Sequence, residues 1–225
     1  MSNPVLELCD DILRNWAATM PMHIILIGAH GTGKTTLANA IGNELGIPVT
    51  ESVARAVKKC FETIFIESPG AKELALQNTL CELSRWDFTR WKECINVMTR
   101  CPLDTLAYAK VNAMNSTNPA KEGFQSIYDH HLEKFKQDET SRQMLKQSVF
   151  LYLPIEFPLE QDGVRPMDVE YQKQVDEAMR QLIYELNITP IMVSGTVEER
   201  VRTFMDHFEK VFSGKNGKVF GGPEN

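Results

Sequence analysis

Apolar residues along the chain alternate between short continuous runs and longer stretches with helical spacing. Residues 23–27 (HIILI) form a continuous run, which is typical of a strand buried on both faces of a parallel sheet. Comparable short runs predict further strands at 47–51, 95–99, 149–153 and 190–193. Because strands that alternate with helices favour parallel pairing, the pattern predicts an α/β fold: a five-stranded parallel sheet flanked by helices on both faces.

Between these runs, apolar residues recur with the spacing of amphipathic helices. Gly46 ends the helix that follows the first strand, and Ser68-Pro69-Gly70 separates the next two. A turn-rich segment, 115–123, precedes a long polar helix. The predicted helices cover residues 5–16, 35–45, 52–66, 71–96, 103–113, 124–147, 169–186 and 197–212. We expect one domain over 1–212 and a flexible tail rich in glycine and polar residues at 213–225.

A glycine-rich loop follows the first predicted strand. Its sequence, GAHGTGKT over residues 28–35, matches the phosphate-binding pattern G-x-x-x-x-G-K-[ST]. Glycines let backbone N–H groups converge on phosphate oxygens, Lys34 reaches the β- and γ-phosphates, and the Thr35 hydroxyl takes a Mg²⁺ position. The strand before the loop and the helix after it favour a real site over a chance match. The residues expected to bind ATP here are Gly28, His30, Gly31, Thr32, Gly33, Lys34, Thr35 and Thr36.

Composition narrows the setting in which such a loop works. The chain has 225 residues, 43% of them apolar, and a formal net charge of −6, which argues against a large nucleic-acid footprint. Five scattered cysteines without a C-x-x-C pair indicate free thiols in a reducing compartment. The N-terminus lacks the features of a signal peptide, and no apolar run is long enough to cross a bilayer. We therefore expect a cytoplasmic protein without a membrane partner.

The chain lacks the sequence signatures of regulatory GTPases and of motor ATPases, which narrows the class of nucleotide-dependent protein. No N-K-x-D segment, which reads guanine in regulatory GTPases, occurs in the chain. The Asp-Glu pair of a motor ATPase should end an apolar strand, but Asp176-Glu177 lies in a helical pattern and is expected on a solvated face. A small phosphotransferase remains, in which arginines stabilise the charge of the moving phosphoryl group.

Several segments occur in an order that resembles a known kinase group. They are the phosphate loop, ESVAR at 51–55, RCPLD at 100–104 with Tyr108, DGVRP at 162–166 and GTVEER at 195–200. Over about residues 23–205 the chain resembles the P-loop kinases that include the ribosylnicotinamide-kinase domain and AAA_28-type nucleoside and nucleotide kinases. It is more distantly similar to thymidylate kinase.

This resemblance implies roles for individual residues. Lys34, Arg100 and Arg165 would stabilise the transferring phosphoryl group, Arg165 from a lid loop at about 155–168. Gly195 and Thr196 would contact the adenine, although Thr196 with Glu199 also fits a helix-capping box.

Acceptor recognition would fall on the helical region 52–96. Glu51 and Arg55 share one face after the second strand, as substrate ligands or as an exposed ion pair. Gln77 and Arg85 are further candidate substrate ligands, whereas the tryptophans beside them, Trp86 and Trp91, fit a core better than a base-stacking site. The neighbouring histidines His130 and His131 fit a polar helix face better than a metal site.

One position departs from the family pattern. The family places Asp before the arginine, where this chain has Thr99-Arg100. Threonine cannot supply the carboxylate that would hold Mg²⁺ or accept a proton. Asp104, four residues further along, either substitutes for it or caps the following helix.

The resulting expectation is an ATP- and Mg²⁺-dependent kinase of a nucleoside or nucleoside monophosphate, with Glu51 and Asp104 positioning the acceptor. Two alternatives stay open: a kinase of a hydroxymethylated base within DNA, as in some thymidylate-kinase-like enzymes of bacterial viruses, and a nucleotide switch without an acceptor. The sequence does not specify the oligomeric state.

Overall fold

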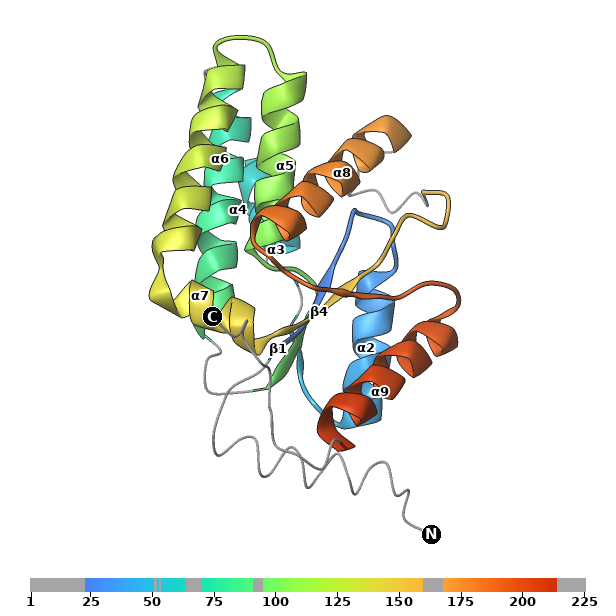
Figure 1. The fold of residues 1–225 in the computed structure, drawn as a ribbon. Helices are drawn as coiled ribbons and strands as arrows, with labels where there is room; N and C mark the ends of the chain where they lie inside the picture. The colour runs from blue at the N-terminus through green and yellow to red at the C-terminus, as the bar shows by residue number, and fades with distance from the viewer. Residues whose placement is uncertain are drawn as a thin grey trace.

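Strands and helices alternate along the chain, as the apolar pattern predicts. The computed structural model describes residues 23–50, 52, 54–63, 70–90, 95–159 and 168–213. In chain order the elements are β1 (His23–Ile27), α2 (Lys34–Leu45), β2 (Val49–Thr50), α3 (Ala54–Thr63), α4 (Ala71–Arg90), β3 (Asn96–Met98), α5 (Pro102–Asn115), α6 (Ala120–Gln137), α7 (Glu139–Gln147), β4 (Val149–Tyr152), α8 (Val169–Glu185), β5 (Ile191–Met192) and α9 (Val197–Ser213) (Figure 1).

The five strands form one parallel sheet in the order β2-β3-β1-β4-β5. The chain leaves β1 to build β2 and β3 on one side and then crosses to build β4 and β5 on the other. The carboxyl end of β1 is therefore the point where the strand order reverses, which is where ligands bind in open parallel sheets. This arrangement confirms the predicted fold class and places the glycine-rich loop at the switch point.

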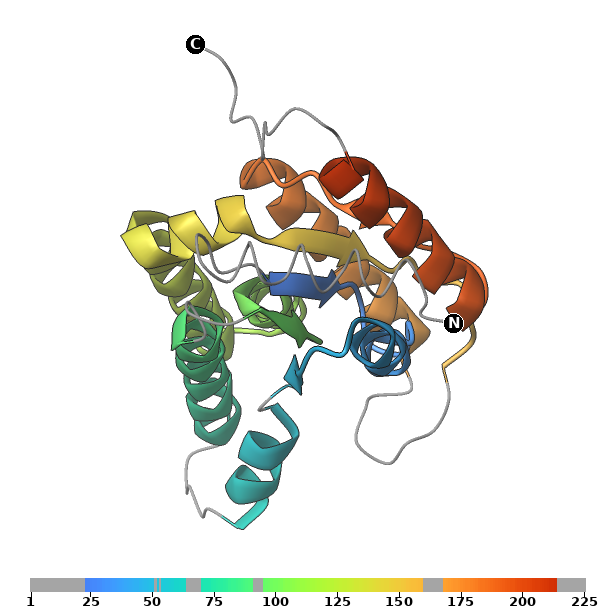
Figure 2. The same ribbon diagram turned by 90° about the horizontal axis from the view of Figure 1, so that it is seen from below.

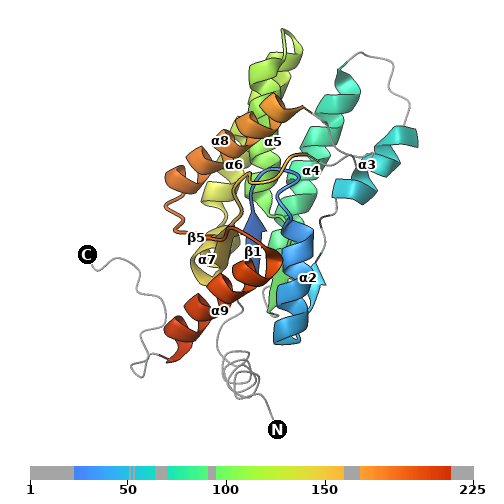
Figure 3. The same cartoon turned by 90° about the vertical axis from the view of Figure 1, so that its right-hand side faces the viewer.

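Helices cover both faces of the sheet, and β1 lies between them (Figure 2). Ile24 and Leu26 pack in a core with α2 and α9, whereas Ile25 and Ile27 pack in a second core with α5, α6 and α8 (Figure 3). Successive side chains of a strand point to opposite faces, so a strand covered on both sides is apolar throughout. All five residues of β1 are buried, as the continuous run predicts.

The helices between β3 and β4 differ from the prediction. The predicted helix 124–147 is two helices, because Asp138 ends α6 and its side chain accepts the Ser141 N–H at 2.8 Å as the N-cap of α7. The predicted turn at 115–123 is shorter, since α6 begins at Ala120. Gly123 indicated a turn but lies inside α6, where a Cβ would come within 2.8 Å of the Leu74 side chain on α4. The glycine permits close packing of the two helices.

Burial corrects three further expectations. Asp176 is only 3% exposed, because its carboxylate accepts the Tyr152 hydroxyl at 2.6 Å between α8 and β4. Trp86 was expected in the core, but it is 53% exposed. His131 is buried, with Nε2 2.8 Å from Asn78 Oδ1, whereas its neighbour His130 is exposed as predicted.

Some predictions fall outside the described residues. They concern the helix at 5–16, the residues around Trp91, most of the lid loop including Arg165, and the tail. Within the described part, Cys81 and Cys101 are free thiols, in agreement with the prediction. Among the helices described, none combines the length and apolar character needed to span a membrane.

Candidate nucleotide-binding site

The glycine-rich loop is the turn between β1 and α2 (blue in Figure 1). Three of its glycines have positive φ: Gly28 at +142°, Gly31 at +78° and Gly33 at +86°. These angles are strained for residues with a Cβ. At Gly28 a Cβ would also lie 2.5 Å from the Leu153 carbonyl oxygen. The loop therefore passes close to the end of β4, and its path requires glycine.

Lys34 is the first residue of α2 and is buried against the loop. Its ammonium donates to the Gly28 carbonyl oxygen at 2.7 Å and to the Ala29 carbonyl oxygen. The Thr32 hydroxyl also donates to the Ala29 carbonyl oxygen, at 3.0 Å. Side chains of the loop sequence thus bind the first two carbonyl groups of the loop.

Side chains from distant helices bind two other loop carbonyl groups. Gln172 of α8 donates its Nε2–H to the His30 carbonyl oxygen at 2.6 Å. Arg200 of α9 donates from Nη1 to the Thr32 carbonyl oxygen at 2.7 Å. The other arm of Arg200 pairs with Glu156, which also accepts the Gly195 N–H at 3.0 Å. Both helices therefore contact the outside of the loop.

The His30 ring packs against two tyrosines, whose rings also contact each other. Its Nδ1 lies 3.1 Å from the Tyr108 hydroxyl, and its centroid is 6.2 Å from the centroids of both Tyr108 and Tyr171. The Tyr171 hydroxyl in turn donates to Asn112 Oδ1 at 2.8 Å. These aromatic residues of α5 and α8 form a wall beside the loop, and the His30 ring packs against it.

Asp104 lies in the first turn of α5 and is fully buried. Its Oδ2 accepts the Cys101 N–H at 3.0 Å, completing a capping box. Its Oδ1 has no hydrogen-bond partner among the described residues. Burial raises the pKa of the Asp104 carboxyl, and the charges of Arg100 and Lys34 oppose that shift. The helix-cap role is therefore present, and one carboxylate oxygen remains available near two cations.

Arg100 follows β3 and adjoins the same cluster. Its guanidinium carbon lies 5.6 Å from the centroid of the Tyr108 ring, in a cation–π contact. Thr99 is buried, and its hydroxyl contacts the Thr50 carbonyl of β2. The structure therefore brings Lys34, Arg100 and Asp104 together, with the tyrosine wall beside them.

The segment after β5 contains the predicted capping box. The Thr196 N–H donates to Glu199 Oε2 at 2.7 Å, and the Glu199 N–H donates to the Thr196 hydroxyl at 3.3 Å. Gly195 precedes the box with φ +89°. An adenine contact at Gly195 and Thr196 stays a prediction, and the two roles are compatible.

The predicted acceptor residues do not all reach this cluster. Gln77 is buried between α4 and α5, where it donates to the Thr105 carbonyl at 2.9 Å and accepts from Asn112 at 3.3 Å. Arg85 pairs with Glu82 on α4 at 2.9 Å. Glu51 lies outside the described residues, as does the side chain of Arg55. Their substrate roles stay predictions.

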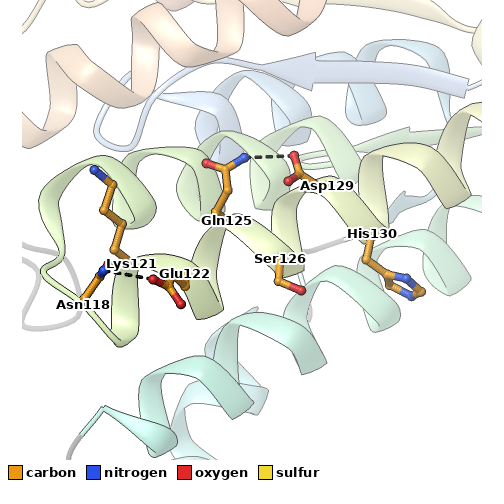
Figure 4. Close-up of a pocket in the computed structure, with 7 residues that line it drawn as sticks. All are labelled: Asn118, Lys121, Glu122, Gln125, Ser126, Asp129 and His130. Carbon is orange, nitrogen blue, oxygen red and sulfur yellow. Dashed lines mark hydrogen bonds between the residues drawn. The ribbon is translucent and has the colours of Figure 1, made fainter.

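A surface groove of about 710 Å³ runs along α6 (Figure 4). Its lining residues all lie on α6 or just before it: Asn118, Lys121, Glu122, Gln125, Ser126, Asp129 and His130. Ligand atoms of His130, His131 and Glu82 lie within 4.8 Å of one another. Glu82, however, already binds Lys134 at 2.7 Å as well as Arg85, and these hydrogen bonds lower its pKa to about 2. We interpret this group as an ion-pair network that joins α4 to α6.

Sequence reasoning missed four residues of the loop environment: Tyr171, Gln172, Arg200 and Glu156. Arg200 ends the GTVEER segment, which gave a weak signal. Gln172 gave none, because an amide within a polar helix has no distinguishing pattern. Their roles depend on contacts between residues far apart in the chain.

A parallel sheet with a glycine-rich loop at its switch point and a lysine opening the next helix defines a P-loop nucleotide-binding protein. A model of the AAA_28 family, described as an AAA domain, matches residues 23–200. The chain belongs to this family. Among curated proteins, no sequence matches it.

Solved structures share its architecture. Deoxyadenosine kinase from M. mycoides with bound dCTP has a TM-score of 0.60 and 13% identity, over 84% of this chain and 100% of that one. Thymidylate kinase from Candida albicans has a TM-score of 0.59 and 15% identity, over 85% and 92%. NadR protein in complex with NR has a TM-score of 0.58 and 17% identity, over 92% of this chain and 56% of NadR, about half of that protein. At such identities the likeness shows the fold, which is that of the P-loop kinases.

Proposed function

We propose that this protein is an ATP- and Mg²⁺-dependent kinase that transfers the γ-phosphoryl group to a hydroxyl of a nucleoside or nucleoside monophosphate. The observation that carries the proposal is the cluster formed by the buried Lys34 and Asp104 with the partly buried Arg100, beside the glycine-rich loop. A binding loop alone would serve any nucleotide switch. Cations and a carboxylate next to it supply what phosphoryl transfer requires. The nucleoside class of acceptor is supported by the neighbours named deoxyadenosine kinase and thymidylate kinase.

The chain's own residues divide the work of transfer. The loop amides and Lys34 bind the phosphates, and Arg100 stabilises negative charge on the moving group. The residues present fit a magnesium site, because Mg²⁺ prefers oxygen ligands. Asp104 Oδ1 is a buried carboxylate oxygen without a hydrogen-bond partner among the described residues, and Thr35, which follows Lys34 in the first turn of α2, supplies a hydroxyl. Thr35 and Asp104 would hold the ion. When bound, Mg²⁺ neutralises phosphate charge.

The roles that we propose in binding the phosphate acceptor, in closing the lid and in binding the base rest on the sequence resemblance. Glu51 and Asp104 position the acceptor hydroxyl, and Arg55 binds the acceptor beside them. Arg165 closes over the phosphates, and Gly195 with Thr196 contacts the base. Gln77 and Arg85 are further ligands of the acceptor, from the helical region that seats it.

The decisive experiment screens the purified chain with ATP and Mg²⁺ against nucleosides, nucleoside monophosphates and DNA that contains hydroxymethylated bases. Mass spectrometry scores the gain of one phosphate. We expect a phosphorylated nucleoside or nucleotide. Transfer to the DNA alone would replace the acceptor class, and slow hydrolysis of ATP without any phosphorylated product would contradict the kinase assignment.

Substitution of Lys34 tests the residue at the centre of the site. Lys34→Ala should lower the transfer rate by about three orders of magnitude or more, because the lost ammonium stabilises transition-state charge. The variant should still unfold cooperatively, at a lower temperature than wild type, because the Gly28 and Ala29 carbonyls lose a donor. Lys59→Ala removes an exposed lysine of α3 and serves as the matched control. Near-normal turnover in Lys34→Ala would contradict the proposal.

A further inference from the structure

Two peptide groups of the phosphate loop are held from outside it. The His30 carbonyl accepts from Gln172, and the Thr32 carbonyl accepts from Arg200. Gln172 and Arg200 are each only 2% exposed. Neither side chain belongs to the sequence motif of the loop, and they reach it across 142 and 168 positions of the chain.

The geometry of the peptide unit gives these contacts a consequence. In a planar trans peptide, the C=O of one residue and the N–H of the next point in opposite directions. A donor that fixes the His30 carbonyl outward therefore turns the Gly31 N–H inward. The same holds for the Thr32 carbonyl and the Gly33 N–H. A phosphate site requires inward N–H groups.

Both peptides precede a glycine, and this makes them easy to turn. Gly31 and Gly33 have φ of +78° and +86°. Glycine populates positive and negative φ about equally, so the peptide before it can adopt either of two orientations, as in type I and type II turns. The loop sequence alone does not choose between these orientations. The Gly28 and Ala29 carbonyls, by contrast, are bound by Lys34 and Thr32 of the loop sequence itself.

Arg200 is itself held in place, and both donors lie close to the glycines of the loop. Arg200 pairs with Glu156, and its guanidinium carbon lies 5.3 Å from the centroid of the Phe157 ring. A Cβ atom added to Gly33 would lie 3.2 Å from Arg200 Nη1, and one added to Gly31 would lie 3.3 Å from Gln172 Nε2. Glu156 balances the charge of Arg200, so the contact acts through orientation more than through added positive charge.

We propose that Gln172 and Arg200 are positioning residues that turn the Gly31 and Gly33 N–H groups toward a bound polyphosphate, an inference that rests on the proposed nucleotide site. Gln172 acts on Gly31, and Arg200 acts on Gly33. Each contact is specific for one peptide group.

The test uses the isotopically labelled full-length chain in NMR experiments, without ligand and with inorganic tripolyphosphate. In the free protein, Gln172→Leu should shift the carbonyl carbon of His30 and leave that of Thr32, whereas Arg200→Met should do the reverse. On addition of tripolyphosphate, the amide signal of Gly31 should no longer shift in Gln172→Leu, whereas that of Gly33 should still shift. In Arg200→Met the Gly33 signal should no longer shift, and the Gly31 signal should still shift. Each variant should bind tripolyphosphate about tenfold more weakly, the effect of one misplaced hydrogen bond to an anion.

Gln174→Leu and Arg202→Met change residues of the same two helices and provide matched controls. Gln174 pairs with Asn115, and Arg202 is exposed. We expect both controls to behave as wild type. Wild-type carbonyl and amide signals in Gln172→Leu and Arg200→Met would overturn the inference, and so would an equal loss of both glycine responses in each variant. If tripolyphosphate moves neither amide of the wild type, the proposed function fails, while the carbonyl signals of the free protein still decide the orientation.

Discussion

Asp104 uses its two carboxylate oxygens differently. Oδ2 caps α5 through the Cys101 N–H, and Oδ1 lies without a described hydrogen-bond partner in the cluster with Arg100 and Lys34. Burial of a carboxylate costs free energy unless charges or hydrogen bonds compensate it. The fold therefore tolerates a buried acidic group here at some cost in stability, which is typical of functional sites.

Asp104→Asn separates the two roles. Its amide oxygen can still accept the Cys101 N–H, so the cap remains. Because burial raises the folded pKa of Asp104, the folded wild type binds the proton more tightly than the unfolded chain, and its stability falls as pH rises from the ordinary pKa through the raised one. At pH 7 the variant should thus be at least as stable as wild type in urea denaturation, while initial transfer rates drop by about 10²–10⁴-fold. Lower stability of the variant, or unchanged transfer rates, would count against this account.

At the scale of elements, β1 shows how a polar residue can belong to a buried strand. His23 is its first residue and is fully buried, and neither ring nitrogen has a hydrogen-bond partner within the described part of the chain. Burial lowers the pKa of His23 to about 4. The residue is therefore neutral in the folded protein at pH 7 and packs as part of the apolar run.

His23 should make the fold sensitive to acid. A folded pKa below the unfolded value gives stability that is complete above about pH 6.5 and is lost as pH falls toward about 4. Between pH 7.5 and pH 5 the loss is about 2 kcal/mol. His23→Leu should remove this component from the pH dependence of urea denaturation, whereas His207→Leu, at an exposed position of α9, should keep it. Equal acid sensitivity in the two variants would contradict the assignment.

Local signals predict elements well where they agree with packing. The run 23–27 and the stop at Gly46 match β1 and the end of α2. Gly123 and Asp138 were misleading, because a glycine in a helix and an N-cap within a polar stretch gain their meaning from the neighbouring element. The first makes room for Leu74, and the second starts a new helix.

At the scale of the molecule, a polar network that includes the buried Tyr152 and Asp176 and the exposed Arg180 joins α8 to β4. Tyr152 donates to Asp176, and Arg180 binds both of them. The network lies between the helix that supplies Gln172 and the strand next to β1. It therefore helps to fix the position of a helix that contacts the phosphate loop.

Asp176→Ala should destabilise the fold by about 1–3 kcal/mol, because it leaves the buried Tyr152 hydroxyl without its acceptor. Combining it with Tyr152→Phe should cost less than the sum of the two single changes in urea denaturation. Glu177→Ala alters the exposed neighbour and should stay within about 0.5 kcal/mol of wild type. Additive effects of the pair would show that the contact is energetically unimportant.

The sequence by itself determined the strand and helix order, the parallel sheet, and the loop with Lys34 at the carboxyl end of β1. Those features depend on periodicity and on motifs a few residues long, which a chain expresses locally. The tertiary structure alone decided the burial of Asp104 and Asp176 and the contacts of Gln172 and Arg200 with the loop. Residues separated by 142 and 168 positions meet only when helices pack on the sheet, so no local pattern could specify those hydrogen bonds.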